Sequence, residues 1–430
     1  MHPDSEEFSS VGGWVATRAS GMKQQRYGNI EQMCLGVNVV APAAVTAKPD
    51  DSSAPEQQQV QVLALKKSDD TSTNIGLRDF FLGSEGCFGC ITSVKLAIHP
   101  LPEVVQYEAI LFPDWEHGIA LLERLARAPS TAYIPASIRL VDNQQFRFGQ
   151  ACKAEVTSAV GKAKDFMKRQ LVTKVLGFDP AVMCAATVVF EGGKEEVAMQ
   201  KAYLNELRKQ YFGIWGGSEA GANGYRLTYA IAYIRDLADQ MGILGESFET
   251  SVPWSRVPFV IKSVKAFLQS GAPLYEGTNY PCYQDMGFSL EDTPEQLVDA
   301  AAYERTSRNG NKKVTKLVEN SHWISYRVSQ LYKQGVCIYF YMALPVPPKY
   351  IGPTAEINKA KVEYYEIVER GCRRCILDAG GSLSHHHGIG KIRRDFASDV
   401  FTPQAADLLN TIRGTLDPNQ VLQAGNGIFQ

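Results

Sequence analysis

The sequence has no excess of charge of one sign. Its 44 basic and 46 acidic residues give a formal net charge of -2, and no long basic run occurs in it. A protein that is drawn to nucleic acid by its overall charge needs a positive surface. We therefore expect no nucleic-acid partner, and any anionic ligand must be bound by local groups.

The chain also lacks a long apolar run. The longest, Val336–Pro347, is shorter than the roughly 20 residues that span a bilayer, and it is rich in β-forming residues. Residues 1–8 are acidic, without the basic and then apolar pattern of a secretory signal peptide. The sequence thus predicts no transmembrane segment, and a buried strand at the apolar run.

Cysteines are few and irregularly spaced. The nine of them form no dense framework of the kind that staples small secreted domains, which indicates reduced thiols in an intracellular compartment. One Cys-x-x-Cys pair, Cys87/Cys90, lies in a glycine-rich loop and the other, Cys372/Cys375, in an expected long helix. Most of the chain separates the two pairs, so we expect no zinc site.

What the sequence does contain predicts two structural units. With 45% hydrophobic and 21% charged residues, the chain has the composition of an ordinary globular protein. Its 430 residues exceed the size at which a single hydrophobic core stops growing.

Glycine-rich loops and short strands dominate the first hundred residues, and longer elements follow. We expect tight loops beside short strands over Gly12–Gly36, and strands at Val60–Leu65 and Ile91–Ile98. Alternating elements after Pro102 predict an α+β domain whose sheet is covered by helices. The strands expected there are 104–112, 137–141, 183–190, 323–331 and 336–342, and the helices 115–127, 161–175, 194–210, 354–379 and 403–416. Residues 273–320 combine turn formers with weak periodicity and predict a surface insertion.

Two glycine-rich loops, Val11–Gly21 and Gly83–Gly89, lie beside expected strands. Glycine lets a backbone come close to a ligand, and successive amide groups can form a concave anion site for a pyrophosphate. A plain turn is the alternative for each loop taken alone. Neither loop is a G-x-G-x-x-G between a strand and a helix, which disfavours a nicotinamide enzyme of the usual type.

Several short motifs together carry a resemblance to a known family. They are Pro3–Ser9, Gly12–Trp14, Ala16–Gly21, Tyr27–Glu31, Pro135–Arg139, Leu227–Tyr229, Ala232–Asp236, Gly245–Thr250, Cys337–Tyr341, Gly380–Gly388, Asp417–Asn419 and Gly425–Phe429. With them the chain resembles the alkyldihydroxyacetonephosphate synthase family of vanillyl-alcohol-oxidase-type flavoproteins. The resemblance implies an α+β fold with an FAD-binding domain of residues 1–100, closed by a C-terminal segment of residues 401–430. A cap domain of residues 101–400 with an antiparallel sheet would complete it, with the active site between the two.

The chain departs from the family pattern at three places. The family's first phosphate-cradling loop would precede residue 1, so we expect this chain alone to bind FAD weakly or not at all. Cys87 and Phe88 stand where the family usually has Thr and Leu, and Cys90 where it has Val. Residues 273–320 have no counterpart in the family.

The resemblance implies that FAD is bound non-covalently by both glycine-rich loops and their flanks. The residues that correspond to cofactor contacts are Pro3, Asp4, Ser5, Ser9, Gly12, Gly13, Ala16, Thr17, Arg18, Ala19, Ser20, Gly83, Ser84, Glu85, Gly86, Cys87, Phe88, Gly89 and Ile91.

Tyr339 lies in an apolar strand, where pattern alone favours packing, with Tyr341 on its face and Phe340 on the other. The resemblance makes Tyr339 the acid/base residue that exchanges the substrate proton. An unperturbed phenol has a pKa near ~10, so a base at this position needs neighbouring positive charge. The histidines and an arginine are candidates to supply it.

Three successive histidines, His385, His386 and His387, are candidate metal ligands or exposed residues. On an extended segment the first and third share one face and the second has the other, so the run cannot present three ligands to one ion without distortion. The resemblance implies a catalytic cluster that handles a phosphate-bearing substrate and protons, with no metal.

Two arginines have both a plain and a functional interpretation. Arg235 would pair with Asp236 or Asp239 on a solvated helix, and Arg139 would be a surface residue at a strand end. The resemblance makes both substrate-binding residues, because a planar guanidinium suits a carboxylate or a phosphate.

By resemblance the chain is a transferase of ether-lipid synthesis. It would exchange the acyl chain of acyl-dihydroxyacetone phosphate for a long-chain fatty alcohol through a covalent adduct at flavin N5, with no net redox change. The resemblance also implies a homodimer, peripheral membrane association and a peroxisomal location. The alternatives are a redox flavoenzyme of the same fold, such as a 2-hydroxyacid dehydrogenase or oxidase, and an inactive truncated product.

Overall fold

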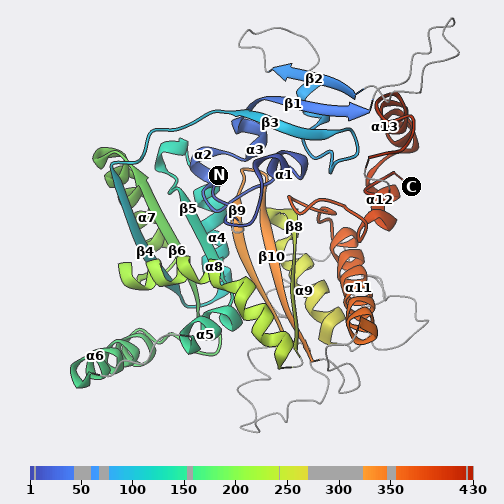
Figure 1. Ribbon diagram of the computed structural model, residues 1–430. Coiled ribbons are helices and arrows are strands. Elements are labelled where there is room, and N and C mark those ends of the chain that lie inside the picture. The colour runs from blue at the N-terminus through green and yellow to red at the C-terminus, as the bar shows by residue number, and fades with distance from the viewer. Residues whose placement is uncertain are drawn as a thin grey trace, which may run out of the picture. The chain divides into compact units, whose positions relative to one another are not determined.

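The computed structural model describes residues 1–3, 6–42, 60–66, 77–152, 158–241, 243–269, 323–345, 355–422 and 425–429. The chain divides into two compact units, whose elements are labelled in Figure 1. The first unit joins Met1–Leu101 to Leu383–Gln430, and the second is Pro102–Ser382. The insertion predicted at 273–320 falls outside the described residues.

The first unit contains a three-stranded antiparallel sheet in the order β2-β1-β3. The strands are β1 (Cys34–Pro42), β2 (Val60–Lys66) and β3 (Cys90–Leu96). Helix α13 (Pro403–Leu416) packs apolar residues such as Leu409 and Ile412 into the same cluster as Val15 and Phe88. The two sequence segments of this unit therefore share one core.

Short helices occupy much of the segment in which tight loops were expected, so that expectation is wrong for these residues. They are α1 (Val11–Ala16), α2 (Gln24–Tyr27) and α3 (Ile30–Met33), and the later helical turns of the unit are η1 (Leu77–Phe80), η7 (Arg394–Phe396) and α12 (Ala397–Val400). Ser10 caps α1, because its hydroxyl accepts a hydrogen bond from the Gly13 amide at 3.1 Å. A good cap and a small-residue sequence thus outweigh the low helix propensity of two glycines.

The second unit is built on one seven-stranded sheet in the order β7-β4-β6-β5-β9-β10-β8, with every pair antiparallel. The strands are β4 (Val104–Phe112), β5 (Ser137–Val141), β6 (Cys184–Gly192), β7 (Ile214–Trp215), β8 (Ile243–Pro253), β9 (Trp323–Leu331) and β10 (Gly335–Pro345). This arrangement confirms the predicted α+β class with an antiparallel sheet.

Helices follow the strands, both where they were expected and at 143–151, 218–240 and 257–269, where no helix range was predicted. They are α4 (Trp115–Ala126), η2 (Thr131–Tyr133), α5 (Asn143–Ala151), α6 (Ala159–Gln170), the π-helical turn η3 (Leu171–Val175), α7 (Lys194–Gln210), α8 (Ser218–Gln240), η4 (Trp254–Arg256), α9 (Val257–Gln269) and α11 (Ala355–Asp378). None of the helices among the described residues is long and apolar enough to cross a membrane.

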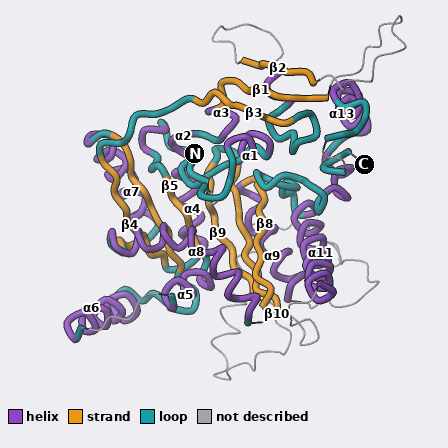
Figure 2. Tube along the Cα trace, in the orientation of Figure 1, coloured by secondary structure: helices purple, strands orange, loops and turns teal. Residues whose placement is uncertain are grey.

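The two faces of this sheet differ in chemistry. Residues such as Leu140, Val328 and Phe340 point into a large apolar core that also contains side chains of α4, α7, α9 and α11. Their strand neighbours on the opposite face include Arg139, Arg327 and Tyr339. Helix α8 lies against strands β4, β6 and β8, as the tube in Figure 2 allows the reader to follow. The polar face is the part of the second unit that bears on function.

Candidate functional site

Strand pairing places Arg327 beside Tyr339 on the polar face of the second unit. The two residues are direct register partners on β9 and β10, and the guanidinium carbon lies 5.1 Å from the ring centroid of Tyr339. The same carbon is 4.9 Å from the ring of Tyr341, which stacks on Tyr339 with an interplanar angle of 18°. One buried guanidinium therefore lies over two tyrosine rings.

Glu249 flanks Tyr339 on the other side. It is the register partner of Tyr339 on β8 and is fully buried. Directly paired residues share a face of the sheet, so a cation, a phenol and an acid form one row across three strands. Such a row can hold or move a proton at the phenol oxygen.

Sequence reasoning missed Arg327, although a pattern marks it. Ser325, Arg327 and Ser329 alternate with Ile324 and Val328, which gives β9 one polar and one apolar face. All three polar residues are buried. A buried polar face needs polar partners, and here it indicates a site rather than a solvated surface.

Arg139 lies on the same polar face, on β5, and is only 2% exposed. Its guanidinium donates to the carbonyl oxygen of Tyr225 at 3.4 Å and lies 4.9 Å from that tyrosine's ring. Burial raises the pKa of Tyr225, an effect that the Arg139 charge opposes. The interpretation of Arg139 as a surface residue is wrong, because α8 covers this end of the strand.

Arg235 lies in an exposed ion pair, which is the first of the two environments expected for it. Half of its side chain is exposed, and it lies 3.6 Å from Glu246 on edge strand β8 and 3.9 Å from Asp236. Burial raises the pKa of Glu246, and Arg235 partly offsets that rise. The structure therefore groups Arg139 and Tyr339 on one face and gives Arg235 a separate ion pair at the sheet edge.

In the first unit, the second glycine-rich loop has the backbone expected of a ligand cradle. Gly83, Gly86 and Gly89 all have positive φ, as does Glu85. The loop is attached to α1 by hydrogen bonds from the Gly83 amide to Val15 and from the Glu85 amide to Ala16. Its backbone thus adopts a shape that glycine permits and most other residues resist.

The first glycine-rich segment packs against this loop. Arg18, at φ 53°, covers Gly83 so closely that a Cβ on Gly83 would lie 2.8 Å from the Arg18 side chain. Gly12 similarly faces the carbonyl of Ile91, 3.1 Å from where its Cβ would be. The two predicted cofactor segments are therefore adjacent.

The remaining predicted cofactor residues have mostly internal contacts. The Ser20 hydroxyl donates to Asn29 at 2.6 Å, the Thr17 hydroxyl to the carbonyl of Gly13, and the indole of Trp14 to Ser9. Ala19 and Phe88 are in the core, and Pro3, Ala16 and Gly13 lie in the same unit. Asp4 and Ser5 are outside the described residues.

Cys87 is also buried in the loop. Burial raises the pKa of its thiol to about 11, which Arg413 lowers only in part. A thiol in that state is neutral at physiological pH. None of the cysteines in the described part of the chain forms a disulfide.

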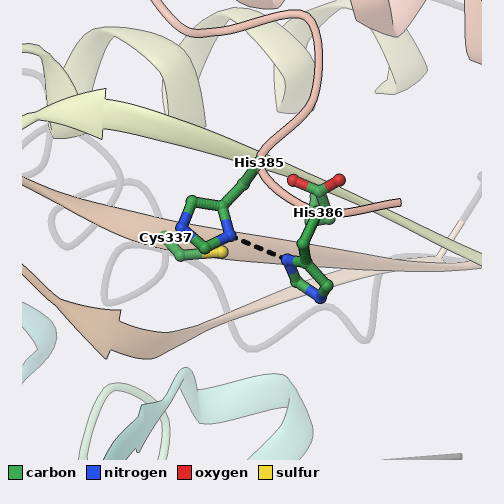
Figure 3. A group of neighbouring side chains, drawn as sticks. Cys337, His385 and His386 are labelled. Atoms are coloured by element: carbon green, nitrogen blue, oxygen red, sulfur yellow. Dashed lines mark hydrogen bonds between the residues drawn. The ribbon is translucent and has the colours of Figure 1, made fainter. Parts of the chain in front are cut away.

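The histidine run lies on a bent segment of the first unit. Nδ1 of His385 and Nδ1 of His386 are 2.8 Å apart, as drawn in Figure 3, and the ring of His387 lies 4.7 Å from that of His386. The alternation expected of an extended segment is therefore wrong, because successive bends turn neighbouring rings toward each other. Two adjacent imidazoles that share a hydrogen bond can pass or hold a proton.

The Glu85 side chain is hydrogen-bonded to the C-terminal segment of the first unit. Its two carboxylate oxygens accept hydrogen bonds from the Ile389 and Gly390 amides, each at 2.6 Å. Asn426 donates to the Glu85 carbonyl at 3.3 Å. Sequence reasoning had placed Glu85 among the cofactor contacts and could not foresee a partner 304 residues away.

The chain matches two family profiles. The one described as "FAD linked oxidases, C-terminal domain" matches residues 101–287 and 299–426, and "FAD binding domain" matches residues 1–46. FAD is the cofactor that both descriptions name. The first profile leaves only residues 288–298 unmatched within 273–320, so the expectation that this stretch has no counterpart in the family is wrong for the rest of it.

Curated relatives and a solved structure carry one name. The chain is 35% identical over 424 residues to "Alkyldihydroxyacetonephosphate synthase" of Caenorhabditis elegans, covering 99% of this chain and 60% of that protein. For the protein of the same name from Dictyostelium discoideum the identity is 25%, covering 97% of this chain and 56% of that one. A solved structure, "alkyldihydroxyacetonephosphate synthase in P212121", superposes with a TM-score of 0.64 at 22% identity, over 97% of this chain and 59% of the other. The chain thus spans about three fifths of the length of these relatives, and the expected fold is confirmed.

One observation indicates that the described residues suit a flavin nucleotide. The Ser84 hydroxyl, in the second glycine-rich loop, is buried and has no hydrogen-bond partner among the residues that the structure describes. An unpaired buried hydroxyl costs free energy, which a polar group of a ligand would recover. The position of Ser84, between a left-handed glycine and Glu85, therefore suits a cofactor contact.

Proposed function

The chain belongs to the family described as FAD linked oxidases, C-terminal domain, and from this premise we propose that it is an alkyldihydroxyacetonephosphate synthase-like transferase. It exchanges the acyl chain of acyl-dihydroxyacetone phosphate for a long-chain fatty alcohol. The observation that carries the proposal is the 35% identity to a protein of that name over 99% of this chain. The match runs over nearly the whole chain, so it spans the segments that contain Arg235, Tyr339 and the histidine run as well as the glycine-rich loops.

The exchange breaks one carbon–oxygen bond and forms another at the same carbon. The acyl group leaves as a fatty acid, the alcohol oxygen takes its place, and the alcohol's proton balances the charge. When bound, FAD supplies an electron-poor ring system that makes a carbon beside the ketone reactive. The chain's own residues bind, orient and move protons.

Tyr339 is the group that we assign to the proton on the carbon beside the ketone. Its hydroxyl-bearing ring is buried, and Arg327 lies over it at 5.1 Å. A nearby positive charge favours the ionised form of an acid, which is the form that accepts a proton. Arg327 therefore supplies the positive charge that such a base requires.

The arginines and histidines are assigned to the phosphate-bearing substrate. Arg139 presents a guanidinium on the same face as Tyr339, and Arg235 keeps a half-exposed one. His385, His386 and His387 handle protons, because His385 and His386 already share a hydrogen bond. This assignment needs no metal.

We assign the first unit to FAD and the second to the substrates. The glycine-rich loops, with Ser84 between left-handed residues, are the cradle for the nucleotide. This assignment follows the family resemblance at residues 3–20 and 83–91, apart from the Glu85 side chain, which is occupied elsewhere in the same unit.

We also assign peripheral membrane association to α6 and η3. Val160, Met167, Leu171 and Val175 are exposed along one side of the helix, where a packed helix would bury its apolar residues. Residues 158–178 carry five cationic residues and one acidic residue. An exposed amphipathic helix with basic flanks suits an anionic lipid surface, where a fatty alcohol would be met. A homodimer and a peroxisomal location remain part of the proposal through the family resemblance.

The decisive test is anaerobic. The chain is incubated with excess FAD, acyl-dihydroxyacetone phosphate and hexadecanol without an electron acceptor, and flavin absorbance and ether product are followed together. We expect many turnovers with oxidised flavin at the end, and no product when the flavin is reduced beforehand. A single turnover that leaves stable reduced flavin would assign the chain to redox chemistry, and no ether product at saturating FAD would refute the transferase.

A further inference from the structure

Glu85 holds the histidine segment by its backbone. Its carboxylate accepts one hydrogen bond from the Ile389 amide and one from the Gly390 amide, both at 2.6 Å. Hydrogen bonds to an ionised acceptor are among the stronger ones in proteins. The contact lies two residues after His387, so the position of the histidines depends on it.

The backbone around this contact is shaped for it. Gly388 has φ 81° and Gly390 φ 53°, conformations that favour glycine. A Cβ on Gly388 would lie 2.5 Å from a carboxylate oxygen of Glu85, so a larger residue there would displace the carboxylate. The glycines thus let two successive amides converge on one carboxylate.

Two further hydrogen bonds are accepted by the carbonyl oxygens of the segment that contains Gly388 and Gly390. Arg393 donates to the carbonyl oxygen of Gly388 at 2.6 Å, and the Gly427 amide donates to that of Gly390 at 2.9 Å. Within this set Glu85 is the contributor from the glycine-rich loop. The loop is attached in turn to α1 through the Glu85 amide and Ala16.

We propose that Glu85 is a positioning residue that couples the glycine-rich loop 83–89 to the histidine segment 385–390. The loop's conformation then sets the placement of the histidines through the Glu85 carboxylate and the amides of Ile389 and Gly390. The proposed coupling rests on the proposed function for its catalytic consequence. The physical link itself can be measured without turnover.

The test compares Glu85→Gln and Glu85→Asp with Asp407→Asn, a carboxylate-to-amide control at an exposed site on α13 of the same unit. Glutamine offers one oxygen where two amides need acceptors, and aspartate keeps the charge on a shorter stem. The first readout is the imidazole spectrum of protein labelled with ¹⁵N-histidine. The second is hydrogen exchange of the peptide that contains Ile389 and Gly390.

In Glu85→Gln we expect the signals of His385, His386 and His387 to move, while those of His99 and His117 stay. Exchange at Ile389 and Gly390 should rise by about tenfold or more, as loss of a charge-assisted hydrogen bond predicts. The histidine signals and amide exchange rates of Glu85→Asp should lie between those of Glu85→Gln and the wild type. Those of Asp407→Asn should match the wild type.

Turnover measurements separate the Glu85 coupling from the proposed transferase function. With FAD bound, Glu85→Gln should lower kcat by about tenfold or more while KM for the acyl substrate stays near the wild-type value. If the wild type makes no ether product but the spectra behave as expected, the proposed function fails and the coupling stands. Histidine signals and amide exchange unchanged in both Glu85 variants would overturn the coupling.

Discussion

Arg373 donates to the Glu369 carboxylate at 2.9 Å, one turn earlier on α11, and both side chains are fully buried. A second nitrogen of Arg373 donates to the carbonyl of Glu249 at 2.8 Å, and the guanidinium lies 5.4 Å from the ring of Phe248. This pair joins a helix to strand β8 from the apolar side of the sheet.

Replacing Arg373 by Met should destabilise the second unit strongly. The change leaves the Glu369 carboxylate buried without its arginine, which costs about 3–5 kcal/mol in comparable cases. The double variant with Glu369→Leu should regain most of the loss, because it removes the stranded charge. Urea unfolding followed by fluorescence measures both.

Lys359→Met is the matched control on the same helix. The Lys359–Glu363 pair is exposed at both ends and 3.8 Å long. We expect no measurable change beyond about 0.5 kcal/mol from it. An equally small effect of Arg373→Met would contradict the buried-pair account.

Asp142 should make the stability of the second unit depend on pH. Burial raises the pKa of Asp142 from 3.8 to about 6, a rise that the Gln145 amide, the Ser325 hydroxyl and the Lys265 charge reduce. The folded state therefore holds the proton more tightly than the unfolded chain does. The stabilisation from this group is complete below pH 3.8 and is lost as the pH rises through about 6.

Asp142→Asn should flatten this dependence. An amide cannot ionise, but its oxygen still accepts a hydrogen bond and can cap α5. From pH 4 to pH 7 the free energy of unfolding of the wild type should fall by up to about 3 kcal/mol relative to that of the variant. Unfolding midpoints in urea across this range provide the measurement. Asp179→Asn, at an exposed aspartate that also accepts a backbone hydrogen bond, should keep the wild-type slope.

Tyr339→Phe should stop proton exchange at the substrate carbon. The change removes the hydroxyl but keeps the ring that stacks on Tyr341 and faces Arg327. Loss of a general acid or base lowers rates by about 10²–10⁴. The assay is the release of substrate tritium into water, with Tyr133→Phe as the control, since Tyr133 packs on Tyr203 instead. Normal tritium release from Tyr339→Phe would refute the assignment.

Arg327→Met should move the activity profile to higher pH, because the ionised phenol loses its neighbouring positive charge. Arg327→Lys keeps the charge without the planar group, so its profile should stay near that of the wild type at a lower rate. Arg208→Met removes a similar contact, 5.2 Å above Trp215, and should leave the profile in place. Profiles that coincide for all three variants would rule out the role of Arg327.

Met167→Asp with Leu171→Asp should weaken membrane binding by putting charge on the exposed apolar side of α6 and η3. Sedimentation with vesicles of phosphatidylglycerol and phosphatidylcholine measures it, and high salt should also weaken binding. Leu408→Asp changes an equally exposed leucine on α13 and should bind as the wild type does. If the Met167→Asp/Leu171→Asp variant and the Leu408→Asp variant bind vesicles equally well, α6 does not bind the membrane.

The elements of the second unit could be predicted well from sequence. Lys194–Gln210 and Ser137–Val141 begin and end where they were expected, because their periodicity and flanking residues are local signals. The short helix at Val11–Ala16 was missed, since its two glycines obscured the cap at Ser10. No range was predicted for β8, α8 or α9, so the length of an element did not by itself make it predictable.

The site was less accessible to sequence reasoning. Tyr339 was identified through resemblance, but its neighbour Arg327 depends on the register of β9 against β10, which local pattern does not fix. Glu85 was predicted as a cofactor contact, and the hydrogen bonds of its carboxylate with the Ile389 and Gly390 amides could not be predicted from the sequence. Contacts between distant segments are set by the fold, and no spacing in the sequence encodes them.

The composition of the first unit from two distant segments has a consequence for synthesis. Residues 102–382 leave the ribosome before the C-terminal segment that bears α13, so the second unit can fold while the first still lacks part of its core. Until translation ends, the apolar cluster around Val15 and Phe88 lacks the side chains of Leu409 and Ile412 that pack against it. We therefore expect nascent chains to need chaperone protection at the N-terminal segment, and amino-terminal fragments to aggregate.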